Sequence, residues 1–217
     1  MKKTITYYNK IIDSFYSSLR QTKANLDNNG IQCLIRTAEL NSIGIYSKEI
    51  EELIKEGYIE RVKQGYYRIT KYSESDSEAK LISCLYPDGV ICMTSALFYY
   101  GYSDRTPLTW DIAIDRNVSK ARFNIDYPYV KPYYIEKKHL EYGIIEAKYE
   151  DCIMKIFDKD RLICECIKHE NKMDREIYNK AIIGYINDSG KNITNLLEYA
   201  KKRNIHKKVR DRIGVWL

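Results

Sequence analysis

The stretch that decides the fold is YIERVKQGYYRI, residues Tyr58 to Ile69. It sets two short β-prone runs around a turn at residues 63–65, directly after an amphipathic segment that stops at Gly57. In the second run Tyr67 and Ile69 alternate with polar neighbours, so we expect them to face a core. The first run is out of phase with this alternation, which indicates a β-bulge. The stretch therefore predicts a small hairpin with a basic tip.

Two short helices are predicted before the hairpin. Thr37 is a suitable N-cap for a helix through Leu40, the region of Gly44 breaks it, and Ser47 can cap a second helix that ends at Gly57. Two helices joined by a tight glycine-containing turn form a helix-turn-helix pattern. With the hairpin behind it, the order is that of a winged helix-turn-helix.

A winged helix can place the start of its second helix in a major groove and the hairpin tip on nearby phosphates. We therefore predict DNA contacts on both elements. The predicted DNA-binding residues are Arg36, Tyr46, Ser47, Lys48, Arg61, Lys63, Gln64 and Arg68. The second helix also carries four glutamates (Glu49, Glu51, Glu52 and Glu56), which disfavour DNA along its length. The alternative is a winged helix that only binds another protein.

The charge distribution favours the DNA reading. The 217 residues include 36 Lys and Arg and 30 Asp and Glu, which gives a net charge of +6. Residues 1–72 hold 12 of these basic and 8 of the acidic side chains, a net of 12 − 8 = +4. Most of the surplus thus lies in the segment that we expect to read DNA.

An apolar seam marks a helix ahead of this segment. Ile5, Tyr8, Ile12, Phe15 and Leu19 recur at alternating spacings of three and four residues. The seam is shorter than three heptads, which favours packing on its own domain over a coiled coil. A homodimer through this helix is the alternative, since helix-turn-helix proteins commonly bind paired half-sites.

The stretch KYSESDSEAK, residues 71–80, is polar and without apolar periodicity, as expected at a domain boundary. We therefore predict a DNA-binding domain at residues 1–72, a linker at 73–80 and a second domain at 81–217.

The second domain is expected to be α+β. We predict a strand at residues 90–92 and a helix from Thr94 to Gly101. Further strands are expected at residues 110–114, 122–127, 133–135 and 143–147, with Pro107, Pro128 and Pro132 at their edges. From Tyr149 to the end the pattern is helical. Strands followed by helices argue against a doubly wound sheet.

No motif in the chain predicts catalysis. It has three histidines, none in an H-E-x-x-H setting, and neither a G-x-S-x-G elbow nor a glycine-rich phosphate loop. Asp158, Asp160 and Glu165 could form a metal site, but a solvated helix start explains them better. The six cysteines form no C-x-x-C pair, and we read Cys164 and Cys166 as packing residues. We expect neither an enzyme nor a cofactor.

The tail AKKRNIHKKVRDRIGVWL, residues 200–217, reads as a basic amphipathic helix with Val209, Ile213 and Trp216 on its apolar face. It is either an inert packed terminus or a contact for DNA or an acidic partner. Its cationic residues are Lys201, Lys202, Arg203, Lys207, Lys208, Arg210 and Arg212.

The sequence also bears on location. No apolar run approaches the roughly 20 residues of a membrane helix. The start MKKTITYYNK lacks the apolar region of an export signal, so we expect a cytoplasmic protein.

Three segments together resemble the abortive-infection AbiEi family of bacterial antitoxins. They are GYIERVKQGYYRI, DGVICMTSALFYYG and DRLICECIKHENKMDREIYNKAIIGYI, in this order. The third is the most specific, with Asp160-Arg161, the Cys164-Glu165-Cys166 core and Asn171-Lys172. The resemblance covers nearly the whole chain from about Gly30.

The resemblance implies a two-domain protein that limits phage spread. Its winged helix would repress the promoter of its own operon, and its C-terminal domain would counter a co-encoded toxin of the nucleotidyltransferase type. Whether that domain contacts the toxin is left open, as is a solitary regulator without a toxin partner.

Overall fold

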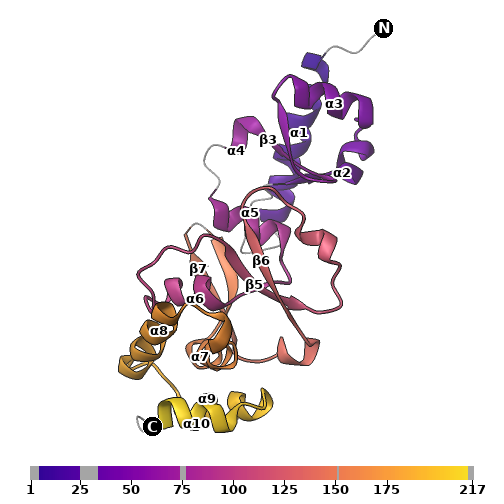
Figure 1. Ribbon diagram of the computed structural model, residues 1–217. Helices are drawn as coiled ribbons and strands as arrows, with labels where there is room; N and C mark the ends of the chain where they lie inside the picture. Colours follow the sequence, from indigo (N-terminus) through magenta and orange to yellow (C-terminus); the bar gives the residue numbers. More distant parts are fainter. Residues whose placement is uncertain (1–4, 25–33, 74–76, 151, 215–217) are drawn as a thin grey trace. The chain divides into compact units, whose positions relative to one another are not determined.

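The computed structural model describes residues 5–24, 34–73, 77–150 and 152–214 (Figure 1). The chain is α+β, as predicted, and contains two sheets among its helices. It divides into two compact units. The first comprises residues 1–87, 124–127 and 150–153, and the second comprises residues 88–123, 128–149 and 154–217. The functional boundary expected at residues 73–80 stays a prediction.

The first unit begins with α1 (Ile5–Ala24) and builds a small sheet among short helices. The sheet has the order β1-β3-β2. Its other elements are β1 (Ile35–Arg36), α2 (Thr37–Ser42), α3 (Ser47–Lys55), β2 (Ile59–Lys63), β3 (Tyr66–Ile69), α4 (Thr70–Ser73) and α5 (Glu78–Leu85). The predicted order of helix, helix and hairpin is therefore present, and α4 and α5 occupy parts of the stretch that was expected to lack structure.

The seam of α1 packs on its own unit. Ile12 is buried in a cluster with residues of α2, α3 and both hairpin strands, and Tyr8 and Phe15 pack against that cluster. This confirms the predicted packing for the middle of the seam. The side chains of Ile5 and Leu19 are not among those that the structure describes.

The hairpin carries the predicted bulge. β2 and β3 are antiparallel, Ile59 pairs with Ile69, and the register shifts between Arg61 and Lys63, which is the expected bulge. Tyr67 and Ile69 are buried, so the inward face of β3 is also as predicted. Gly65 turns the chain with φ +81°, a conformation that favours glycine.

The two helix starts differ from the prediction by one residue. Arg36, not Thr37, is the N-cap of α2, and Tyr46, not Ser47, is the N-cap of α3. In each case a glutamate of the first turn accepts the cap's backbone N–H, from Arg36 to Glu39 at 2.8 Å and from Tyr46 to Glu49 at 3.1 Å. Each glutamate thus satisfies the backbone N–H of the N-cap residue, which is the role of the third helical residue in a capping box.

The second unit is built on a five-stranded sheet of order β6-β5-β4-β8-β7. β4 is antiparallel to β5 but parallel to β8, and β5 is parallel to β6. The strands are β4 (Val90–Ile91), β5 (Trp110–Asp115), β6 (Val130–Ile135), β7 (Ile144–Tyr149) and β8 (Cys152–Phe157). The helix α6 (Met93–Tyr99) follows β4, and the 3-10 turns η1 (Lys120–Phe123) and η2 (Lys137–His139) lie between strands.

Three strand predictions need correction. Residues 122–127 form no strand, because η1 takes the first of them and the rest are irregular. Pro132 lies inside β6 and not at its edge, which the sheet tolerates because β6 is an outermost strand. The segment after Tyr149 is not helical from its start, because β8 precedes the helices.

Helices end the second unit. They are α7 (Lys159–Lys168), η3 (Glu170–Lys172), α8 (Arg175–Asn187), α9 (Ile193–Lys202) and α10 (His206–Ile213). Figure 1 shows α9 and α10 next to each other. The tail is thus not one helix, because Asn204 takes φ +56° between α9 and α10. Val209 and Ile213 are buried as predicted, and Trp216 lies outside the described residues. In the part of the chain that the structure covers, no helix has both the length and the apolar character needed to cross a bilayer.

Candidate nucleic-acid interface

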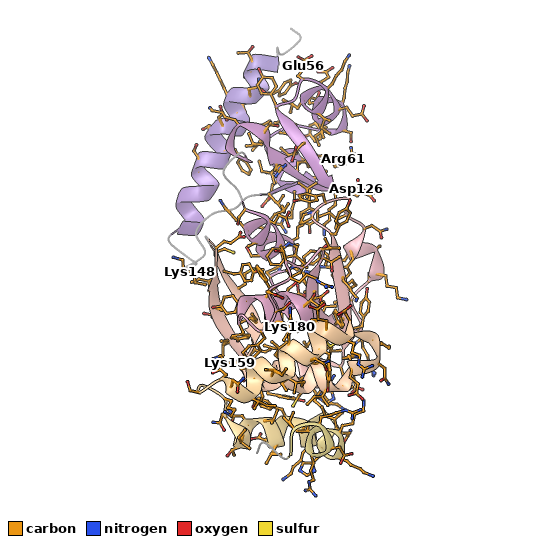
Figure 2. All side chains as sticks on the ribbon, turned by 60° about the vertical axis from the view of Figure 1, so that its left-hand side comes forward. Glu56, Arg61, Asp126, Lys148, Lys159 and Lys180 are labelled. Carbon is orange, nitrogen blue, oxygen red and sulfur yellow. The ribbon has the colours of Figure 1, made fainter. Side chains whose placement is uncertain are left out.

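The hairpin tip carries the predicted cationic side chains. Arg61 and Gln64 are exposed, and Lys63 is half-buried at the end of β2. Figure 2 labels Arg61 on the hairpin. The bulge between Arg61 and Lys63 breaks the strict alternation of β2, so both residues remain near the same end of the hairpin. The turn, the bulge and the cations of the tip therefore all come from the local sequence.

Aromatic rings hold the cations of the tip. The Lys63 ammonium lies 4.5 Å from the ring centre of Tyr66 and 5.4 Å from that of Tyr86, and the Arg61 guanidinium lies 5.8 Å from that of Tyr67. Such contacts orient a cation without neutralising it. Among the residues that the structure describes, Arg61 makes no ion pair.

Two predicted arginines are already partnered by carboxylates. Arg68 forms a cross-strand ion pair with Glu60. Arg36 lies 3.2 Å from Glu39, which raises the pKa of Arg36, and its side chain keeps 60% of its exposure. The pairing of Arg36 with Tyr66 in the sheet brings Arg36 beside the hairpin. Both arginines thus lie on or beside the hairpin, and a neighbouring glutamate offsets part of the charge of each.

The start of α3 presents the other predicted group. Tyr46, Ser47 and Lys48 are all exposed, and Tyr46 keeps 59% of its accessible surface. Glu49 is turned toward the backbone N–H of Tyr46, so its charge complements the positive end of the helix. The other end of α3 leads through Gly57 into β2. The tip and the α3 start are therefore two separate groups on one unit.

The cationic residues near the C-terminus differ in burial and in ion pairing. Arg203 is buried at 7% exposure and binds Glu165 through two hydrogen bonds of 2.6 and 2.9 Å, so it lies in the interior. Lys208 and Arg212 pair with Glu170, and Lys202 pairs with Glu198. Three exposed cations of the predicted set have no ion pair among the described residues. They are Lys201, Lys207 and Arg210.

The carboxylates considered as a metal site have separate structural roles. Asp158 caps α7 by accepting the Arg161 backbone N–H at 2.7 Å. Asp160 is buried and accepts the Tyr185 hydroxyl at 2.7 Å, and Glu165 is buried between two arginines. The prediction of a solvated helix start is therefore wrong for Asp160 and Glu165. Within the described residues no group of three metal-ligating side chains comes together.

Two hollows of the first unit had no signal in the sequence. One is a shallow groove of about 340 Å³ lined by Glu51, Ile54, Lys55 and Arg61. The other is a pocket, also of about 340 Å³, between α1 and the base of the hairpin. The lining of the pocket comes from segments up to about sixty residues apart, so no local motif could have predicted it.

Comparison with known proteins gives one family match. Residues 33–70 match a family model described as "Transcriptional regulator, AbiEi antitoxin". No curated protein matches the chain. Among solved structures, the RV2827C protein from Mycobacterium tuberculosis is 14% identical, with a TM-score of 0.48, over 92% of this chain and 81% of that one. In residues 33–70, which include α2, α3 and the hairpin, the chain is thus similar to the transcriptional regulators of the AbiEi antitoxin family, as its sequence predicted.

Proposed function

We propose that the chain is an antitoxin that also regulates transcription, and that its first unit is a winged helix that binds promoter DNA. The observation that carries this proposal is the hairpin tip, where Arg61 is exposed and without an ion pair among the described residues. It lies in the segment that matches the AbiEi antitoxin family of transcriptional regulators. Repression of the chain's own operon and action against a nucleotidyltransferase-type toxin are the finer parts of the proposal.

In the proposed complex the start of α3 enters the major groove. Ser47 and Lys48 would lie nearest the base edges, while the exposed Glu51 and Glu52 lie one turn further along the helix, beyond its N-terminal end. Glu49 is the acidic residue closest to the DNA, and its bond to the Tyr46 backbone directs its charge to the helix start. The acidic character of α3 is therefore compatible with contacts made through its first turn.

The hairpin would supply phosphate contacts. A protein that neutralises Z phosphates shows a slope of about −0.9Z when the logarithm of its binding constant is plotted against that of the salt concentration. Arg61 and Lys63 together should account for two such contacts. Arg36 and Arg68 should account for less, because Glu39 and Glu60 already offset their charges.

The test is the double substitution Arg61→Ala and Lys63→Ala in the full chain. We expect the salt slope of binding to the DNA upstream of the gene to become shallower by about two units. Gel-shift titrations between roughly 50 and 200 mM salt measure this slope. A matched control removes two exposed lysines of the second unit, Lys120 and Lys148, and should leave the slope unchanged.

An unchanged slope in the hairpin variant would remove the hairpin from the DNA interface. No binding by the unsubstituted chain at low salt would favour the second candidate, a winged helix that binds only a protein. The exposed glutamates of α3 and the groove where Glu51 and Lys55 meet Arg61 support that candidate. It predicts co-purification of a partner that the groove substitution Ile54→Glu releases.

A homodimer through α1 remains a finer proposal. The face of α1 that carries Ile12 is used by the unit's own core, so a dimer would have to use the face that carries Tyr7 and Lys10, both exposed. Light scattering of the full chain with Tyr7→Glu tests this face, and a mass equal to that of the unsubstituted protein would contradict it.

A further inference from the structure

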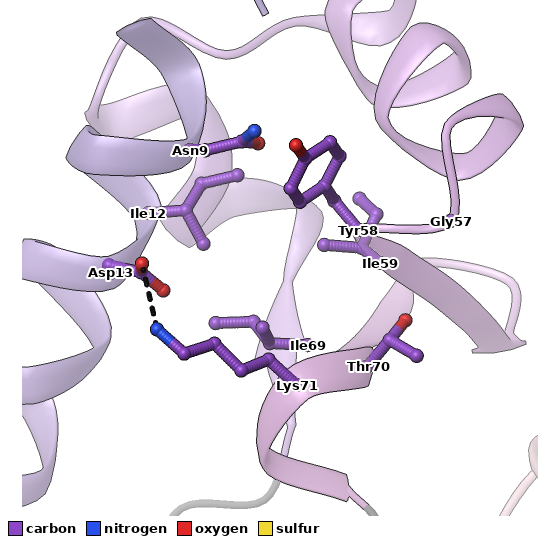
Figure 3. Close-up of a pocket in the computed structure, with 9 residues that line it drawn as sticks. All are labelled: Asn9, Ile12, Asp13, Gly57, Tyr58, Ile59, Ile69, Thr70 and Lys71. Carbon is purple, nitrogen blue, oxygen red and sulfur yellow. Dashed lines mark hydrogen bonds and ion pairs between the residues drawn. The ribbon is translucent and has the colours of Figure 1, made fainter. Parts of the chain in front are cut away.

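The pocket between α1 and the hairpin base is lined by three segments of the first unit (Figure 3). α1 supplies one wall, the connection from α3 into β2 supplies the second, and the junction of β3 with α4 supplies the third. Its volume of about 340 Å³ lies in the range of small-ligand sites, about 300–1,000 Å³. The lining residues are Asn9, Ile12, Asp13, Gly57, Tyr58, Ile59, Ile69, Thr70 and Lys71.

The interior of the pocket is mostly apolar. Ile12, Ile59 and Ile69 are each at most 5% exposed and belong to the core cluster of the unit. Gly57, held at φ +73°, has no other atom within 4 Å of where a Cβ would lie, which leaves the space on that side open. A molecule in the pocket would therefore bury apolar surface against side chains that the fold already fixes.

The pocket lining has few polar side chains, and they lie at different places in it. Asp13 and Lys71 form an ion pair at 3.4 Å, drawn as a dashed line in Figure 3. The Asn9 side chain points from α1 toward the Tyr58 ring in the same view. The Asn9 Oδ1 atom is buried and has no hydrogen-bond partner among the described residues. A buried acceptor in this state costs free energy until a donor reaches it.

We propose that this pocket binds a small, largely apolar molecule that carries one hydrogen-bond donor, with the donor on Asn9 Oδ1. The isoleucines would cover the apolar body, and the pair of Asp13 and Lys71 would border it. The site does not depend on DNA binding, and its occupancy can be measured in the protein alone.

Two bicyclic probes of nearly equal size test the proposal. Indole offers one N–H donor, and benzofuran has an oxygen acceptor in the same place. We expect indole to bind the full chain about fivefold more tightly, which corresponds to one hydrogen bond of ordinary strength. Two-dimensional NMR titration should place the shift changes at the amides of the pocket segments.

The substitution Asn9→Leu should reduce the indole-to-benzofuran affinity ratio to about one while benzofuran still binds, which shows that the pocket is intact. The matched control is Ser14→Leu, an exposed position of the same helix, where the ratio should stay near five. Three results would overturn the proposal. They are equal affinities in the unsubstituted protein, tighter binding of benzofuran, and no binding of either probe at millimolar concentration.

Discussion

At the scale of single residues, the second unit depends on a buried charge network. Arg161 is fully buried, and its Nη2 atom contacts Glu165 at 2.7 Å and the carbonyl oxygen of His139 at 3.1 Å. Arg203 binds the same carboxylate from the end of α9. Burial alone would raise the pKa of Glu165, but the two arginines hold that pKa below its usual range. Glu165 therefore stays charged inside the unit.

Removing this charge should strongly destabilise the protein. Glu165→Gln leaves two buried arginines without their carboxylate, and breaking a buried pair in this way costs about 3–5 kcal/mol. Urea denaturation of the full chain measures the change in the free energy of unfolding. The control Glu198→Gln breaks an exposed pair with Lys202 on α9 and should cost less than about 1 kcal/mol. Equal effects of the two substitutions would show that the network contributes no more than a surface pair.

The network also shows what the sequence could not predict. Glu165 follows Asp158 and Asp160 closely, so its local pattern resembles an exposed acidic helix start. Its partner Arg203 is 38 residues further along the chain, and nothing near either residue indicates the pairing. The hairpin tip could be predicted because its turn, bulge and cations all lie within Tyr58–Ile69.

At the scale of helices and strands, periodicity predicted the elements that stand alone and missed those that depend on neighbours. The hairpin and α1 follow their apolar patterns. β8 was missed because it runs directly into α7, and its apolar residues continue into the helical pattern. Residues 122–127 alternate like a strand, but an ion pair of Arg122 with Asp88 and the turn η1 give them another structure. Sheet neighbours, absent from a local window, decide such cases.

The helix α10 is tied to η3 by one carboxylate. Glu170 receives hydrogen bonds from Arg212 at 2.8 and 3.1 Å and lies 3.3 Å from Lys208. These cations lower the pKa of Glu170 from 4.5 to about 2. Because the folded-state pKa lies below the unfolded value, the stabilisation is present above pH 4.5 and is lost as the pH falls toward about 2.

Arg212→Ala should raise the pKa of Glu170 toward 4.5 and so make stability less dependent on pH between 2 and 4.5. NMR titration of the side-chain carboxyl group measures the pKa directly. Arg210→Ala, on the same helix but without an ion pair among the described residues, is the control and should leave the titration unchanged. A Glu170 midpoint near 4.5 in the unsubstituted protein would contradict this assignment.

At the scale of the whole molecule, we propose that the two activities belong to different units. The basic surplus of residues 1–72 is +4 of a total of +6, and the proposed phosphate contacts lie there. The action against a toxin is proposed for the second unit. A substitution at the hairpin tip should therefore affect regulation without affecting protection.

This separation can be measured in cells that carry a promoter reporter and, where a nucleotidyltransferase-type reading frame neighbours the gene, that reading frame under separate control. The chain with Arg61→Ala and Lys63→Ala should allow several-fold higher reporter expression, because it loses about two phosphate contacts. It should still restore growth when the toxin is induced. Loss of growth protection at an unchanged protein level would show that the two activities are not separable. If no such toxin gene neighbours this one, the solitary-regulator reading gains support.

The division of the chain affects how the molecule can be dissected. Residues 124–127 and 150–153 belong to the first compact unit although they follow most of it by several dozen positions. A fragment that stops at residue 87 would consequently lack two short pieces of its own unit, and Cys152 and Ile153 of the second piece are also the first residues of β8. Point substitutions in the intact polypeptide therefore assign roles more cleanly than truncated fragments can.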